Sequence, residues 1–293
     1  MRAPELFDVP VAGGTLRVAR WPGRDGAPVA LCAHGVTATH RAWSLIAEHL
    51  DGDVTVVAPD LRGRGGSNAI TGPFGIPQHT EDLAAVLDHL SLPNAVFVGH
   101  SMGAFVVAVA AVRHPERVGG LVIMDGGIKL LDAPVEADID ALLHQIIGPS
   151  MERLKTTFAS RAAYQDFWRR HPAFAGDFNE HVQAYVNYDL IGDEPALRSG
   201  VSLEAVYADS RDTLTDPLTV TAIEQITRPA IFLRAQRGVM NEPSGLYSHE
   251  QIAALQARVP HLEPHLLEAS HFSMMLGQGS AEVAAFIRKA CGA

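Results

Sequence analysis

Cysteine and long apolar runs are both scarce in this sequence. Two cysteines, Cys32 and Cys291, occur among 293 residues, so a framework of disulfide bonds is not expected. No stretch reaches the roughly 18 apolar residues that a membrane-spanning helix needs. The first ten residues include Glu5 and Asp8 and lack an apolar core, so a signal peptide is not expected there. These absences together predict a soluble, cytoplasmic protein with no membrane partner.

Positive charge is also in deficit. The chain has 33 Asp and Glu against 23 Lys and Arg, a net charge of −10, and no run of basic residues. Without a basic surface, nucleic acid is not an expected partner. What the sequence does contain is 47% hydrophobic residues, enough for a sizeable core, which excludes wholesale disorder. A homo-oligomer remains open.

Short apolar runs alternate with helix-length segments through the first 127 residues. Strands are predicted at 29–33, 54–58, 95–98 and 121–124, and helices at 41–50, 78–90 and 102–113. Residues 5–11 and 15–21 predict an antiparallel hairpin at a sheet edge. Continuous apolar strands separated by helices are typical of a parallel sheet that is covered on both faces.

This alternation stops between residues 128 and 227, where only helical segments are found. Strands are predicted again at 230–233 and 265–267, before a last helix over 280–290. We therefore expect a core domain made of residues 1–127 and 228–293, with a helical cap over 128–227. Connections of this length usually have a function.

A glycine-flanked serine lies between a predicted strand and a predicted helix. The motif Gly99-His100-Ser101-Met102-Gly103 is G-x-S-x-G in the strand–turn–helix context that gives it meaning. The turn is so sharp that side chains two residues either side of the serine would collide, which accounts for the two glycines. Ser101 is therefore the predicted nucleophile. The backbone N–H of Met102 is predicted to be one donor to the oxyanion.

The second donor and the base are predicted from their positions after strands. His34-Gly35-Val36 follows the strand at 29–33, and Gly35 would let the Val36 N–H face the serine. Among 14 histidines, His271 follows the last predicted strand, where the base of such a site is expected. His100 is expected to point away from the cleft, and polar helical surfaces are the expected places of three more: His114, His171 and His181.

These motifs resemble those of the α/β-hydrolase superfamily. His34-Gly35, the stretch 60–67 (DLRGRGGS), the motif at 99–103 and the stretch 269–272 (ASHF) stand in the order of that family. The resemblance spans nearly the whole chain except residues 128–227. It implies a doubly wound, mostly parallel eight-stranded sheet flanked by helices, with a helical cap inserted after the sixth strand. It also implies hydrolysis through an acyl-serine, with no metal or cofactor.

The acid that would orient His271 has two candidate positions. Superfamily members commonly carry it after the strand predicted at 230–233, but residues 235–238 hold no Asp or Glu, and the nearest is Glu242. In many haloalkane dehalogenases and some lactone hydrolases the acid follows the strand beyond the nucleophile, where this chain has Asp125. Asp125 is the expected acid, and Glu242 is the alternative.

The expected cap is rich in aromatic residues, with nine between residues 150 and 212. Most of these rings are expected to pack the cap helices together. The candidate pocket residues are Trp43, Trp168, Met240 and Phe272. The expected substrate is a small or medium hydrophobic carboxylic ester or lactone.

Two functions other than ester or lactone hydrolysis stay open. One is a hydrolase of a carbon–carbon bond in a vinylogous diketone acid, which would need a cation for the substrate carboxylate. The candidates for that cation are Arg153, Arg161, Arg169 and Arg170. The other is a non-catalytic receptor for a small molecule on the same fold. A serine nucleophile argues against dehalogenase or epoxide hydrolase chemistry.

Overall fold

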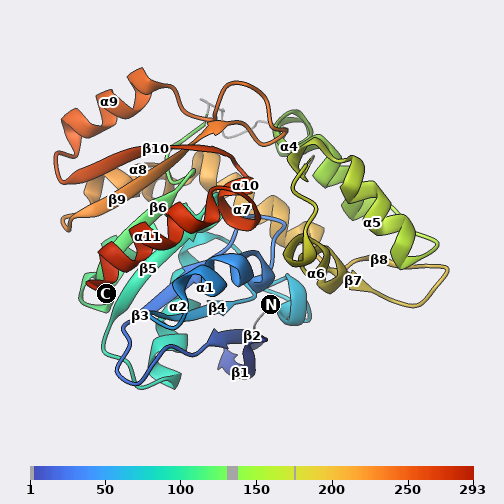
Figure 1. The fold of residues 1–293 in the computed structure, drawn as a ribbon, viewed down its shortest axis with the longest axis horizontal. Coiled ribbons are helices and arrows are strands. Elements are labelled where there is room, and N and C mark those ends of the chain that lie inside the picture. Colours follow the sequence, from blue (N-terminus) through green and yellow to red (C-terminus); the bar gives the residue numbers. More distant parts are fainter. Residues whose placement is uncertain (1–2, 131–137, 175) are drawn as a thin grey trace.

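Eight strands form one sheet in the computed structural model, which describes residues 3–130, 138–174 and 176–293. Their order is β1-β2-β4-β3-β5-β6-β9-β10 (Figure 1). The strands are β1 (Glu5–Val11), β2 (Gly14–Trp21), β3 (Val29–Ala33), β4 (Thr55–Pro59), β5 (Ala95–His100), β6 (Val118–Met124), β9 (Ala230–Arg237) and β10 (Leu262–Ser270). The β1–β2 and β2–β4 pairs are antiparallel and the others parallel. The expected mostly parallel sheet is confirmed.

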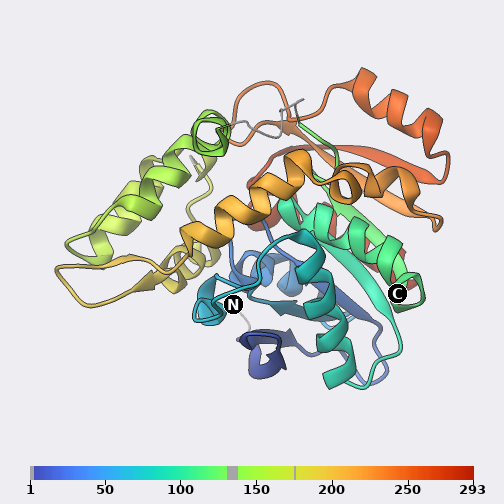
Figure 2. The ribbon, with the colours of Figure 1, turned by 180° about the vertical axis from the view of Figure 1, so that it is seen from behind.

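Helices cover both faces of the sheet. Helices α1 (Ser44–Leu50) and α11 (Ser280–Cys291) lie on the face seen in Figure 1. On the other face are α2 (Ile76–His89), α3 (Met102–Arg113) and α8 (Pro217–Gln225), seen in Figure 2. Neighbouring residues of β3, such as Leu31 and Cys32, belong to separate apolar clusters on these two faces. Both faces are therefore buried, which explains why the central strands are apolar throughout.

The segment between β6 and β9 is mainly helical. It contains α4 (Ile139–Lys155), α5 (Arg161–Arg170), α6 (Glu180–Tyr188), the short strands β7 (Leu190–Ile191) and β8 (Arg198–Ser199), α7 (Leu203–Thr215) and α8. We call residues 128–227 the insertion. Its last helix, α8, packs on α3, and Ala222 and Ile223 join the apolar cluster on that face of the sheet. The boundaries of a cap domain at residues 127/128 and 227/228 stay a prediction.

Shorter elements complete the chain. In the described part of the chain these are α9 (His249–Arg258), α10 (Ser273–Leu276) and the 3₁₀ helices His40–Trp43, Gly65–Ser67, Pro115–Arg117 and Pro172–Phe174. Helix α9 was not anticipated from the sequence. Its Ile252 and Leu255 are buried one turn apart, and its other positions are mostly exposed, so its apolar signal is weak.

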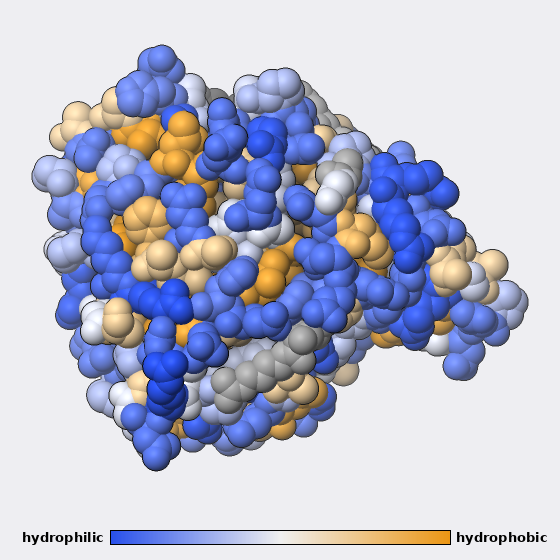
Figure 3. All heavy atoms as spheres, viewed as in Figure 1, coloured by the Kyte–Doolittle hydropathy of each residue, from blue (hydrophilic) through white to orange (hydrophobic). Residues whose placement is uncertain are grey.

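The outer surface is predominantly hydrophilic on the face shown in Figure 3, with apolar atoms in small groups. In the described ranges, the large hydrophobic side chains that are exposed are Leu6 and Leu266. No helix within those ranges has the length and apolar character needed to cross a membrane. They also contain no group of three or more His, Cys, Asp or Glu side chains arranged to hold a metal ion.

Candidate active site

Ser101 stands on a strained turn between β5 and α3. Its backbone has φ +56° and ψ −120°, a conformation that non-glycine residues rarely adopt. A Cβ on Gly99 would lie 2.1 Å from the carbonyl oxygen of Gly103, and one on Gly103 would lie 2.0 Å from that of Ala33. Close backbone packing therefore requires both glycines: Gly99 packs within the turn, as the motif predicted, and Gly103 packs against the end of β3.

Asp125 and His271 are joined by a short hydrogen bond. His271 Nδ1 lies 2.7 Å from Asp125 Oδ2, and both residues are buried. Asp125 directly follows β6 and also has a positive φ, +43°. Its N–H donates to the Leu233 carbonyl at 2.7 Å, and its Oδ1 accepts from the Ala235 N–H at 3.0 Å. The carboxylate is thus fixed between the carboxyl ends of two neighbouring strands.

Glu242, the alternative acid, is engaged elsewhere. Its Oε2 accepts a hydrogen bond from the backbone N–H of Met240 at 2.9 Å, and its carbonyl accepts from Gly238 at 3.0 Å. Its carboxylate therefore stabilises its own loop, and the partner of His271 is Asp125.

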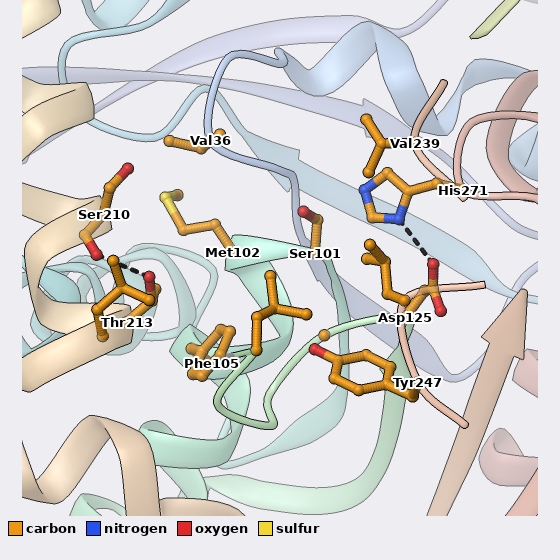
Figure 4. Close-up of a pocket in the computed structure, with 14 residues that line it drawn as sticks. Val36, Ser101, Met102, Phe105, Asp125, Ser210, Thr213, Val239, Tyr247 and His271 are labelled. Atoms are coloured by element: carbon orange, nitrogen blue, oxygen red, sulfur yellow. Dashed lines mark hydrogen bonds and ion pairs between the residues drawn. The ribbon is translucent and has the colours of Figure 1, made fainter. Parts of the chain in front are cut away.

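Ser101 and His271 face a common space. Both line the same two pockets, which are described below. In Figure 4 the His271 ring directs one nitrogen to Asp125, and its other nitrogen lies on the side of the ring that faces the Ser101 hydroxyl. Gly126, the residue after Asp125, packs against the serine, because a Cβ there would lie 2.1 Å from the Ser101 carbonyl oxygen.

The turn after β3 lies against Ser101. A Cβ on Gly35 would be 3.3 Å from Ser101 Cβ, and Val36 lines the same pockets as the serine. His34 Nε2 accepts from the Leu61 N–H at 3.0 Å, so its Nδ1 donates to the Gly35 carbonyl at 2.8 Å. Burial lowers the pKa of His34 to about 3, and the ring is neutral near pH 7. This histidine fixes the direction of the Gly35 carbonyl.

Two buried arginines hold the same turn. Arg64 Nε donates to the Val36 carbonyl at 2.9 Å, and its Nη1 pairs with Asp209 of α7 at 2.5 Å. Arg153 of α4 donates to the Thr37 carbonyl at 3.3 Å and pairs with Asp189. Residues 35–38, which we call the oxyanion turn because they contain the predicted donor Val36, are therefore connected through charged pairs to the insertion.

Three of the other histidines differ from expectation. His100 lines a pocket beside His271, with ring centroids 4.5 Å apart, and its Nε2 donates to the His271 carbonyl at 2.9 Å. It does so because β5 extends through His100 and aims this side chain toward the loop after β10. His171 and His181 are buried rather than on polar surfaces, because His171 packs against Phe167 and Trp168 within the insertion and His181 meets Ser44 of α1. His114 is partly exposed and meets Glu81.

Two pockets meet at the serine. Pocket A lies between α3, α7 and the loop after β9 and is lined by Val36, Ser101, Met102, Phe105, Asp125, Gly126, Leu130, Ser210, Thr213, Leu214, Val239, Leu246, Tyr247 and His271 (Figure 4). Pocket B lies beneath α4 and α6 and is lined by Gly35, Val36, Thr37, Ala38, Ala42, His100, Ser101, Ser150, Tyr185, Val239, His271, Phe272, Met275 and Leu276. Both walls are mainly apolar, as ligand pockets usually are.

Of the four candidate pocket residues, Phe272 lies at a pocket and three do not. Trp43 and Trp168 are fully buried in an apolar cluster that joins the insertion to the sheet, and they line neither pocket. Their large rings fill space between packed helices, so the expectation for both is corrected. Met240 also lines neither pocket, and its neighbour Val239 takes that place.

Several residues that line pocket A were not predicted from the sequence. Phe105 lies one helical turn after Ser101 on α3, so the spacing of the nucleophile helix could have identified it. Ser210, Thr213 and Leu214 share one face of α7 by the same spacing. No signal in the sequence showed that α7 is the helix of the insertion that lines pocket A.

Comparisons with known proteins agree with this architecture. Residues 28–185 match the alpha/beta hydrolase fold family. The chain is 32% identical to the lipase LipV of Mycobacterium tuberculosis over 174 residues, which are 59% of this chain and 64% of the lipase. It is 26% identical to 3-oxoadipate enol-lactonase 2 of Acinetobacter baylyi, over 86% of this chain and 84% of the lactonase.

A solved structure shares the fold along the whole chain. The crystal structure of E-2-(acetamidomethylene)succinate hydrolase superposes with a TM-score of 0.79, covering 99% of this chain and 100% of that one at 21% identity. The sheet order, the glycine-flanked serine turn and the match over more than half of the sequence lead to one conclusion. This chain belongs to the α/β-hydrolase family.

Proposed function

We propose that this protein is a serine hydrolase that cleaves a small or medium hydrophobic carboxylic ester or lactone through an acyl-enzyme. The observation that carries the proposal is the hydrogen bond of 2.7 Å between His271 and Asp125 at the pocket that Ser101 lines. In this assignment Ser101 is the nucleophile, His271 the general base and acid, and Asp125 the group that orients the imidazole.

The reaction follows from these positions. His271 Nε2 removes the proton of the Ser101 hydroxyl, and the serine oxygen attacks the ester carbonyl carbon. The backbone N–H groups of Val36 and Met102 stabilise the negative oxygen that forms. His271 then protonates the leaving alcohol as the carbon–oxygen bond breaks. In the second half, His271 activates a water that releases the carboxylic acid and restores the serine.

The pocket walls and the relatives support an ester substrate. Apolar side chains dominate both pockets, which favours hydrophobic groups around the scissile bond. The similar proteins include one named as a lipase and one as an enol-lactonase, and both names denote hydrolysis of a carboxylic ester bond.

The carbon–carbon hydrolase reading has less support. Its acidic substrate needs a cation near the serine, and the four arginines proposed for that task line neither pocket. Arg153 is buried against Asp189, and Arg161, Arg169 and Arg170 are exposed on α5. The 2-hydroxymuconate semialdehyde hydrolase of a Pseudomonas strain is 30% identical over 70% of this chain, which keeps this reading as the second candidate.

A burst experiment tests the proposal and separates an enzyme from a receptor. The protein mixed with p-nitrophenyl butyrate should release about one equivalent of p-nitrophenol rapidly, followed by steady turnover. The variant Ser101→Ala should retain the fold, checked by circular dichroism, and lose both phases. Binding of the ester without release of p-nitrophenol by the unmodified protein would support the receptor instead.

A further inference from the structure

The two pockets divide the space around Ser101 into two branches. They share the residues closest to the chemistry, Val36, Ser101, Val239 and His271, and otherwise have different walls. An ester bound with its carbonyl carbon at the Ser101 hydroxyl has an acyl group and an alcohol group that must extend in different directions. The two branches offer one space for each group.

Neither branch has a cationic wall. No Lys or Arg is found among the described residues that line pockets A and B. Leu130 of pocket A precedes a segment that is not described, but the sequence from residue 131 to residue 149 contains no Lys or Arg. Lys129, the neighbour of Leu130 in sequence, is not a lining residue.

The two arginines that bind the oxyanion turn are already neutralised. Arg64 and Arg153 both donate to carbonyls of the oxyanion turn, and each forms an ion pair with a buried aspartate of the insertion. Burial alone would raise the pKa of Asp209, but His79 and Arg64 hold it below the ordinary value, so Asp209 is ionised beside Arg64. These guanidinium groups are therefore not free to bind a substrate carboxylate.

The polar groups of the walls are mainly neutral. Hydroxyl groups line each branch: Ser210 and Thr213 in pocket A, and Ser150 and Tyr185 in pocket B. Burial raises the pKa of Tyr185 to about 12, which keeps its phenol protonated near pH 7. In Figure 4 Ser210 and Thr213 lie across the pocket from His271, beyond Met102. Hydroxyls can bind an ether, ester or hydroxyl oxygen but cannot balance a full negative charge.

We infer that the substrate is uncharged in both its acyl and its alcohol half, and that the enzyme discriminates against esters that carry a carboxylate in either half. The inference rests on the proposed function. A carboxylate enclosed without a cation loses its hydration with no compensation. The carboxylate of Asp125, which lines pocket A, provides no attraction for an anion either.

Two matched pairs of esters test this on the unmodified protein. The acyl pair is mono-p-nitrophenyl adipate and its neutral methyl ester, and the alcohol pair is 4-acetoxybenzoate and its neutral methyl ester. We expect kcat/KM for the neutral member to exceed that of the anionic member by about 100-fold or more in each pair. Equal or faster hydrolysis of an anionic member would overturn the inference.

A cation placed in pocket A provides the second test. In one of the two pairs the charged half of the ester occupies pocket A. For that pair, Thr213→Lys should reduce the ratio of kcat/KM for the neutral ester to kcat/KM for the anionic ester by about tenfold or more. The matched variant Thr213→Met should leave this ratio unchanged. The ratio is taken within each pair, so a general loss of activity in a variant cancels. If Thr213→Lys and Thr213→Met gave equal kcat/KM ratios in both ester pairs, charge at this wall would not select the substrate.

The controls distinguish this inference from the proposed function. If Ser101→Ala leaves the hydrolysis of the neutral esters unchanged, the serine mechanism is wrong. If hydrolysis depends on Ser101 but the charged esters react equally well, the mechanism stands and the inference about the substrate is wrong.

Discussion

Asp125 uses both oxygens of its carboxylate, one for His271 Nδ1 and one for the Ala235 N–H. Asp125→Asn keeps the shape of the side chain but replaces one carboxylate oxygen with an NH₂ group. An NH₂ group cannot accept the proton of His271 Nδ1, so the variant favours the wrong tautomer of the imidazole. We expect kcat for a p-nitrophenyl ester to fall by about 10³–10⁴-fold. Steady-state kinetics of the purified variant measures this.

The matched control for that variant is Glu242→Gln. Glu242 accepts a hydrogen bond from the Met240 N–H, and a glutamine oxygen can do the same, so activity should be nearly unchanged. A large loss in Glu242→Gln with little loss in Asp125→Asn would assign the acid to Glu242.

Among single residues, the sequence predicted those whose place depends on the local backbone better than those that line a pocket. Ser101 could be identified because its turn requires two glycines: Gly99 packs against the backbone of the turn itself, and Gly103 packs against the end of β3. Asp125 could be chosen because residues 235–238 lack a carboxylate. Trp43 could not be placed, because whether a large ring fills a core or lines a pocket depends on contacts distant in the sequence.

The geometry of the oxyanion turn depends on two buried ion pairs. Arg64 donates to the Val36 carbonyl and pairs with Asp209 through separate nitrogens of one planar group. Arg64→Lys keeps a positive charge but cannot reproduce this fork. We expect kcat to fall by about tenfold or more with a smaller change in KM, since a displaced Val36 N–H weakens the transition state more than substrate binding. Steady-state kinetics separates the two parameters.

Arg113→Lys is the matched control for this variant, because Arg113 pairs with Glu81 at the surface. It should leave kcat and KM unchanged. If Arg64→Lys raised KM and left kcat intact, Arg64 would act on substrate binding and not on the oxyanion turn.

The elements themselves were predictable where the apolar pattern was regular. Helix α3 occupies the expected residues 102–113, and the strand β3 the expected residues 29–33. Helix α8 lies in the insertion by sequence but packs on the sheet face beside α3. Its position depends on packing partners more than a hundred residues away, and the local pattern contains no information about them.

On the scale of the whole molecule, buried polar contacts join the insertion to the rest of the chain. Tyr188 donates to Asp60 at 2.7 Å, and Asn179 donates to the Leu276 carbonyl at 2.7 Å. The Asp209 carboxylate also accepts from the Gly75 N–H at 2.8 Å. Because an intramolecular hydrogen bond contributes about 0.5–1.5 kcal/mol net, separating the insertion from the sheet would lose stabilisation at several places at once.

This tight packing makes stability depend on pH through His171. The side chain is buried after α5, its Nδ1 accepts from the Ala173 N–H, and its Nε2 has no partner in the part of the chain that the structure describes. Burial first and the nearby Arg153 second lower the pKa of His171 to about 4. An unfolded histidine titrates near pH 6.5, so the unfolded chain takes up the proton first as pH falls.

His171 therefore lowers the free energy of unfolding as pH falls from about 6.5 toward 4, and contributes no such loss above that range. His171→Asn keeps an acceptor for the Ala173 N–H and removes the titration. In urea unfolding, we expect the variant to lose on the order of 2 kcal/mol less stability than the unmodified protein between pH 7 and pH 5. His49→Asn, at an exposed position, should behave like the unmodified protein. Equal losses in His171→Asn and the unmodified protein would mean that His171 takes up its proton in the folded state as readily as in the unfolded chain.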